Sequence, residues 1–103
     1  MMNIVKKQSD DRLVIALEGR LDISTVSDLE QVVINDLDGV TELVFDFEKL
    51  VYISSAGLRT LLLAQKKMNP RGSMKVIHVN EMVMEVFIAM GFADIMTIER
   101  EKI

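Results

Sequence analysis

Two adjacent serines, Ser54 and Ser55, are the residues of this chain best placed for chemistry. They follow an apolar segment and precede a leucine repeat with helical spacing, so we expect them at the start of a helix. A helix start carries unpaired backbone N–H groups and about half a positive charge, so it tolerates an anion such as phosphate. Gly57 offers no side chain to obstruct a protein that approaches the hydroxyl. From these residues alone, a simple N-cap is the more common role of such a serine, and both interpretations stay open.

Asp22 and Asp46 are the carboxylates that invite a metal-site interpretation, and His78 is the single histidine. Magnesium needs carboxylates together with phosphate oxygens or waters, so two carboxylates alone predict no metal site, and we assign Asp22 to a loop or a cap. No serine–histidine–carboxylate arrangement accompanies His78, which we assign to the core or to a strand face. A glycine-rich phosphate loop is also missing from the sequence. We therefore predict no enzymatic activity and no cofactor.

The composition is that of one globular domain, and we assign residues 1–103 to it. Of the 103 residues, 50% are hydrophobic and 27% are charged. There is no cysteine, which excludes disulfides and thiolate sites, and the net charge of −4 disfavours binding to nucleic acid. No segment resembles a signal peptide or reaches the ~18 apolar residues of a spanning helix. We expect a cytoplasmic monomer without membrane insertion.

Hydrophobic periodicity predicts eight elements in the order β-β-α-β-α-β-α-β. The expected strands are about 3–8, 12–18, 43–45, 74–79 and 95–98. Strands that alternate with helices pair in parallel through right-handed crossovers. The sequence therefore predicts an α/β domain with a mixed, mostly parallel sheet, in which the N-terminal hairpin strand is antiparallel.

Three main helices are expected at about 26–37, 55–68 and 81–90, with Ser24 and Asn80 as the N-caps of the first and third. Their apolar residues recur at three- and four-residue spacing, which predicts one buried stripe on each helix. The three stripes are Val26, Leu29, Val33 and Leu37; Leu58, Leu61, Leu62 and Met68; and Val83, Val86, Phe87 and Met90. Met84 and Ile88 are expected on the outer face of the third helix.

Two separated segments resemble the STAS family, the sulfate transporter and anti-sigma factor antagonist domains. One is the strand with Asp46 followed by Ile53-Ser54-Ser55-Ala56-Gly57-Leu58 and a leucine-rich helix, and the other is Glu18-Gly19-Arg20-Leu21-Asp22. The order of elements also matches, from the hairpin to Gly91-Phe92. Asp22 and Asp46 match acidic positions of the family near the same end of the sheet.

The resemblance implies a phosphorylation switch. In stand-alone members, a kinase that is itself the anti-sigma factor phosphorylates the serine before the small residue–glycine–leucine step. That serine corresponds to Ser55, and Ser54 is the alternative site, where many members have aspartate. The unphosphorylated chain is expected to bind the kinase and release the sigma factor, phosphorylation to end binding, and a serine phosphatase to reverse it.

The residues expected to bind the partner surround this switch: Asp22, Ser54, Ala56, Gly57, Arg59 and Leu63. Leu63 falls on the polar side of the second helix together with Arg59, which makes these two our expected docking edge. The alternative function is a STAS scaffold subunit of a signalling or transporter assembly. Ser55 would then be an N-cap beneath an interface and would not be phosphorylated.

Overall fold

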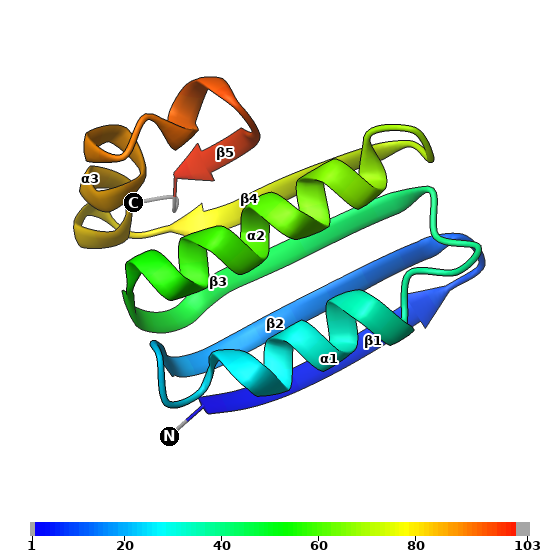
Figure 1. The fold of residues 1–103 in the computed structure, drawn as a ribbon, viewed down its shortest axis with the longest axis horizontal. Coiled ribbons are helices and arrows are strands. Elements are labelled where there is room, and N and C mark those ends of the chain that lie inside the picture. The colour runs from blue at the N-terminus through cyan, green and yellow to red at the C-terminus, as the bar shows by residue number, and fades with distance from the viewer. Residues whose placement is uncertain (1, 101–103) are drawn as a thin grey trace.

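The computed structural model describes residues 2–100, which form one five-stranded sheet with helices on one side (Figure 1). The strands lie side by side in chain order: β1 (Met2–Ser9), β2 (Arg12–Leu21), β3 (Glu42–Ile53), β4 (Ser73–Val79) and β5 (Thr97–Arg100). β1 and β2 form an antiparallel hairpin, and the other neighbouring pairs are parallel. The predicted element order and mixed sheet are confirmed.

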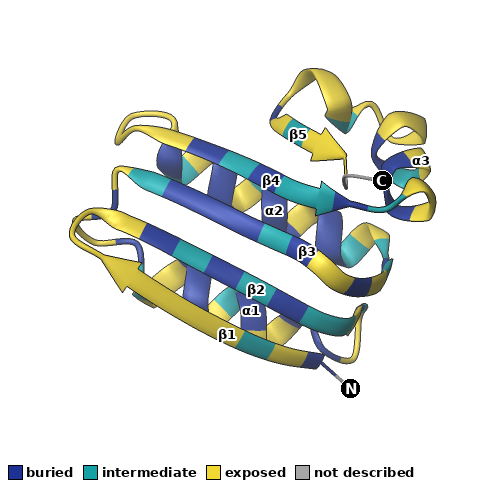
Figure 2. Cartoon of the chain, turned by 180° about the vertical axis from the view of Figure 1, so that it is seen from behind, coloured by how far each residue is buried: buried dark blue, intermediate teal, exposed yellow. Residues whose placement is uncertain are grey.

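The helices are α1 (Val26–Asn35), α2 (Ser55–Met68) and α3 (Glu81–Ala89), with a 3-10 turn at Phe92–Asp94. α1 and α2 cover one face of the sheet, and α3 lies beyond the end of β4 (Figures 1 and 2). Alternate strand residues point under the helices and are buried: Leu13, Ile15 and Leu17 of β2, and Leu43, Phe45 and Phe47 of β3. Phe47 stacks on Phe87 with 6.3 Å between ring centroids, which anchors α3 to the sheet. None of the helices within residues 2–100 is long and apolar enough to cross a membrane.

The second face of the sheet carries no helix of the described chain (Figure 2). It holds a polar pair, because Asp46 lies between the buried Phe45 and Phe47 and points the other way. The His78 Nδ1 and Asp46 Oδ1 atoms are 2.8 Å apart, so the two side chains are hydrogen-bonded. His78 has φ of 59° and lies in a bulge of β4, where Val76 and Val79 pair with Ile98 and Arg100. The extra residue returns Val79 to the core, at the cost of a left-handed backbone at His78.

Several predicted boundaries differ from the structure. α1 ends at Asn35, earlier than predicted, and its N-cap position is Thr25, whose side chain makes no cap hydrogen bond. The predicted cap, Ser24, directs its hydroxyl to Asp22 instead. β3 runs on to Ile53, well past the predicted end at about residue 45, so the serines follow the strand directly. β5 begins at Thr97, two residues later than predicted.

The predicted orientation of α3 is wrong at two methionines. Met84 is buried in the core, whereas Met90 is exposed. The helix ends at Ala89, so Met90 lies past the last turn and leaves the stripe, and Gly91 with φ of 76° then redirects the chain. Ile88 is exposed, as expected.

Candidate functional site

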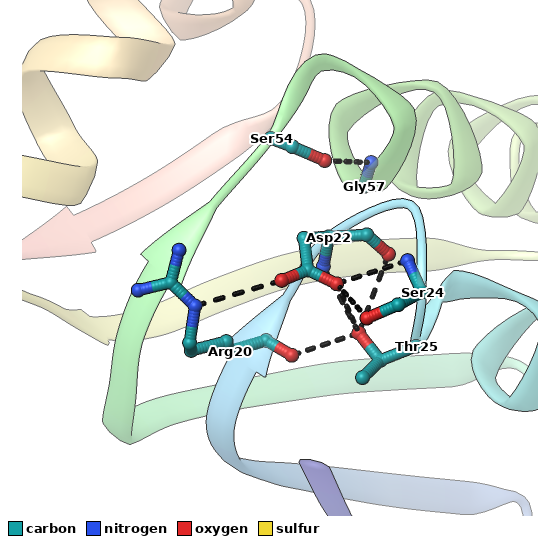
Figure 3. Close-up of polar contacts among 6 residues, drawn as sticks. All are labelled: Arg20, Asp22, Ser24, Thr25, Ser54 and Gly57. Carbon is teal, nitrogen blue, oxygen red and sulfur yellow. Dashed lines mark hydrogen bonds and ion pairs between the residues drawn. The ribbon is translucent and has the colours of Figure 1, made fainter. Parts of the chain in front are cut away.

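The start of α2 is formed by the end of β3 and by Ser54, which is the N-cap. Ser54 has an extended backbone, and its hydroxyl oxygen accepts a hydrogen bond from the Gly57 N–H over 3.4 Å (Figure 3). The Ser54 N–H donates to the Leu21 carbonyl at 2.9 Å, which ties the cap to the end of β2. Ser55 is the first residue of α2 and is exposed, and its hydroxyl makes no hydrogen bond to any residue in 2–100. Ser54 therefore caps the helix, whereas the Ser55 hydroxyl is exposed to solvent.

The charge at this helix start differs from that of the other two main helices. α2 has no acidic residue in its first turn, whereas α1 has Asp28 and α3 has Glu81. Lys66 and Lys67 in the last turn of α2 match the negative end of its dipole. The positive end of α2 is therefore not compensated by a carboxylate of its own first turn.

Gly57 does not have the role predicted from the sequence, which was to leave the serine hydroxyl accessible. It is buried, and a Cβ at this position would lie 2.8 Å from Leu21 Cγ and 3.0 Å from Ile53 Cγ1. The prediction that Gly57 opens a path to the hydroxyl is wrong, because its missing side chain faces the sheet. The glycine instead lets the first turn of α2 pack closely on the ends of β2 and β3.

Asp22 lies in the loop between β2 and α1, beside this helix start (Figure 3). Its Oδ1 accepts hydrogen bonds from the Ser24 hydroxyl at 2.6 Å and the Ser24 N–H at 3.0 Å, and its Oδ2 lies 3.5 Å from Arg20 Nε. The bond from the Ser24 hydroxyl is the main cause that lowers the pKa of Asp22; the Ser24 N–H and Arg20 act in the same direction, and partial desolvation opposes them. Asp22 is thus a loop residue, as expected from the sequence, and its lowered pKa favours the ionised form.

Three of the other predicted partner-binding residues lie together on the helical surface. Ala56, Arg59 and Leu63 line a shallow hollow of about 250 Å³, with Glu30 of α1 and Thr60 at its other walls. Arg59 and Leu63 are exposed, as the helical spacing predicted. The hollow begins one residue after Ser55, so this edge is continuous with the start of α2.

Asp46 is not part of this region. It lies within β3 on the helix-free face, where its Oδ1 contacts His78 and also accepts from the Glu48 N–H at 3.0 Å. The expectation that Asp22 and Asp46 share one end of the sheet is wrong, because β3 continues well past Asp46. Within residues 2–100, no group of three or more His, Cys, Asp or Glu side chains is placed to hold a metal ion.

Sequence reasoning missed Arg20 and Tyr52. The two residues are register partners on β2 and β3, and the Arg20 guanidinium carbon lies 4.2 Å from the centre of the Tyr52 ring. Arg20 was visible only as part of a family segment, and no local pattern joins it to a residue in the next strand. The site therefore has a stacked arginine that the sequence alone did not indicate.

Comparison with known proteins identifies the family. The STAS domain model matches residues 3–102. A curated relative from Bordetella bronchiseptica, named as the anti-sigma factor antagonist BtrV, is 30% identical over 103 residues, covering 98% of this chain and 89% of the relative. The chain belongs to the STAS domain family.

Solved structures share the fold. An anti-sigma factor antagonist from Mycobacterium paratuberculosis superposes with a TM-score of 0.87 at 19% identity, covering 96% of this chain and 86% of that one. The Bacillus cell fate determinant SpoIIAA in its phosphorylated form gives a TM-score of 0.66 at 19% identity, with 93% and 90% covered. The fold is thus that of the anti-sigma factor antagonists.

Proposed function

We propose that this chain is an anti-sigma factor antagonist switched by phosphorylation of Ser55. The unphosphorylated chain binds a serine kinase that is also the anti-sigma factor, and the sigma factor is thereby released. Phosphorylation ends this binding, and a serine phosphatase restores it. The chain acts as substrate and ligand, without catalysis of its own, and we place it in the cytoplasm, where sigma factors act.

The observation that carries this proposal is the contrast between the two serines. The Ser54 oxygen is directed at the helix start and accepts from the Gly57 N–H, whereas Ser55 is exposed with a hydroxyl that bonds to nothing within residues 2–100. A kinase needs an accessible hydroxyl, so this arrangement supports Ser55 over Ser54. The family membership and the relative named as an antagonist support the general role. SpoIIAA, which shares the fold, has been solved both with and without phosphate.

A phosphate on Ser55 is compatible with the folded domain. It adds about −1.5 to −2 charges, and at a helix start it meets the positive end of the dipole. α2 has no first-turn carboxylate to repel it. We therefore expect the fold to persist, and the phosphate to act at the interface through its bulk, its desolvation cost and its charge.

The partner surface in this proposal surrounds Ser55 on two sides. Asp22 contributes from the β2–α1 loop, and Ala56, Arg59 and Leu63 contribute from α2. Ser54 holds the helix start in place as its cap. Gly57 acts indirectly, because it sets how closely α2 approaches the sheet.

The test uses the purified chain, ATP and each anti-sigma-type serine kinase of the source organism, with the phosphate mapped by tandem mass spectrometry. Label on Ser55 is expected in the wild type and in Ser54→Ala, and none in Ser55→Ala. Ser27→Ala is a matched control, because Ser27 is also exposed in the first turn of a helix. Label on Ser54 or elsewhere would overturn the assignment.

Kinase binding separates the switch from the scaffold. Ser55→Ala is expected to bind the kinase permanently, even in the presence of ATP, and Ser55→Asp to bind poorly. If no kinase labels the chain and both variants leave its complexes unchanged, the scaffold function is supported instead.

A further inference from the structure

Arg20 has hydrogen-bond donors that are not used within the described chain. It lies at the carboxyl end of β2, next to the end of β3 that leads into Ser55. Its guanidinium stacks over Tyr52 at 4.2 Å, and among the described residues only its Nε approaches a carboxylate, at 3.5 Å from Asp22 Oδ2. The terminal nitrogens have no hydrogen-bond partner within residues 2–100, and the side chain is 53% exposed. Asp22 already accepts two hydrogen bonds from Ser24, so the position of its carboxylate depends little on Arg20.

Stacking on Tyr52 preorganises the Arg20 guanidinium for binding a partner. A guanidinium presents its N–H groups in a planar fork that matches a carboxylate, and arginine is enriched among the residues that dominate protein interfaces. Contact with the Tyr52 ring restricts the side chain before a partner arrives, so less conformational entropy is lost on binding.

The surroundings of Arg20 also suit a protein partner. Arg20 and Leu21 pair with Tyr52 and Ile53, which places Arg20 next to the strand end that leads into Ser55. Two large apolar side chains near this strand end are exposed: Ile23, three residues after Arg20, by 84%, and Val51, which precedes Tyr52, by 57%. A charged donor flanked by exposed apolar groups is the composition of an interface centre.

We propose that Arg20 is a specificity residue that binds a carboxylate of the serine kinase, with Tyr52 as its positioning residue. This inference rests on the proposed function, because the kinase is the partner that must approach Ser55. Arg20 engages the kinase through a bidentate contact before phosphate transfer.

The experiment measures the affinity of the unphosphorylated chain for the kinase that labels it, by titration calorimetry without nucleotide. Arg20→Gln is expected to weaken binding about ten- to thirtyfold, as for a central interface arginine. Arg12→Gln is the matched control: Arg12 is on the same strand at its opposite end, is similarly exposed, and pairs with Glu42. We expect less than about a twofold change there, since surface ion pairs contribute little.

Tyr52 is tested by variants that separate the ring from the hydroxyl. Tyr52→Phe keeps the stacking surface and is expected to keep wild-type affinity, whereas Tyr52→Leu loses it and is expected to weaken binding several-fold. In the Arg20→Gln background, Tyr52→Leu is expected to lower the affinity for the kinase little further, because the two residues act through one contact. Unfolding midpoints of all variants check that each is folded, and Arg20→Lys, which keeps the charge without the fork, is expected to lie between wild type and Arg20→Gln.

Failure of the Arg20 inference can be distinguished from failure of the proposed function. Equal effects of Arg20→Gln and Arg12→Gln on a wild type that binds would overturn this inference alone. An effect of Arg20 that appears only with ATP present would also overturn it, since the arginine would then recognise nucleotide phosphate. If the wild type binds none of the kinases, the proposed function fails and this inference fails with it.

Discussion

The starts of α2 and α3 follow parallel strands at the same edge of the sheet, yet they are built differently. Asn80 caps α3 with a short bond, accepting from the Val83 N–H at 2.9 Å, and its amide also donates to the Leu50 carbonyl at 3.0 Å. Ser54 caps α2 through one long bond of 3.4 Å. The start of α3 is therefore fixed to the sheet through its cap side chain, whereas the cap of α2 is joined to the sheet, within the described chain, only through its backbone N–H.

The charge at the two starts differs in the same way. The first turn of α3 contains Glu81, which pairs with Arg100 at 2.8 Å. The first turn of α2 contains no acidic residue and begins with the exposed Ser55. A helix start is therefore a candidate switch when its first turn lacks a carboxylate and its cap leaves a neighbouring hydroxyl accessible.

The largest expected effect concerns the third residue of each helix, which is Val83 in α3 and Gly57 in α2. Val83→Gly removes a buried side chain and adds a glycine to a helix. We expect the free energy of unfolding to fall by about 3 kcal/mol, measured by urea denaturation. A loss below about 1 kcal/mol would mean that α3 contributes far less to the core than its burial implies.

Gly57→Val tests the close approach of α2 to the sheet. The new side chain collides with Leu21 and Ile53, so we expect a loss of about 1–3 kcal/mol in the free energy of unfolding. Leu21→Ala in the same chain should relieve part of this loss, which a double-mutant cycle measures. Strict additivity of the two changes would contradict the contact.

The caps themselves should rank in the order of their hydrogen bonds. Asn80→Ala is expected to cost about 1–2 kcal/mol, because it removes a short bond and leaves the Leu50 carbonyl without its partner. Ser54→Ala is expected to cost about 0.5 kcal/mol, the low end for a cap. The reverse order in thermal unfolding would show that the cap of α2 is stronger than its geometry indicates.

The smallest expected effect is acid sensitivity of the Asp22 loop. The pKa of Asp22 is lowered below its ordinary value of 3.8, so its contribution to stability is complete above that value and is lost as the pH falls through the lowered pKa. Asp22→Asn should therefore show a smaller loss of stability than the wild type between pH 5 and about pH 2. Parallel pH profiles of the two proteins would contradict the hydrogen-bonded, ionised carboxylate.

The sequence predicted those features that local patterns encode. The bounds of α2 and the Asn80 cap followed from helical spacing and from the residues at the helix ends. The length of β3 could not be predicted in this way, because Glu48 and Lys49 interrupt its apolar run while the strand continues beside β2. Val51, Tyr52 and Ile53 have strand-forming side chains, but the two charged residues before them break the pattern, so the extension was not predicted.

Contacts between strands could not be predicted in the same way. The Arg20–Tyr52 stack and the Asp46–His78 pair depend on the register of β2 with β3 and of β3 with β4. That register includes bulges, and a shift of one residue would move each side chain to the other face. The candidate serine could therefore be found from the sequence, but its charged surroundings required the structure.

The most direct test of the switch is the affinity of the labelling kinase for the chain before and after stoichiometric phosphorylation of Ser55. We predict a stable complex with the unphosphorylated chain and none detectable by calorimetry with the phosphorylated chain, while amide NMR shifts change only near the start of α2. Equal affinity of the two forms, or shift changes across the whole sheet, would contradict it.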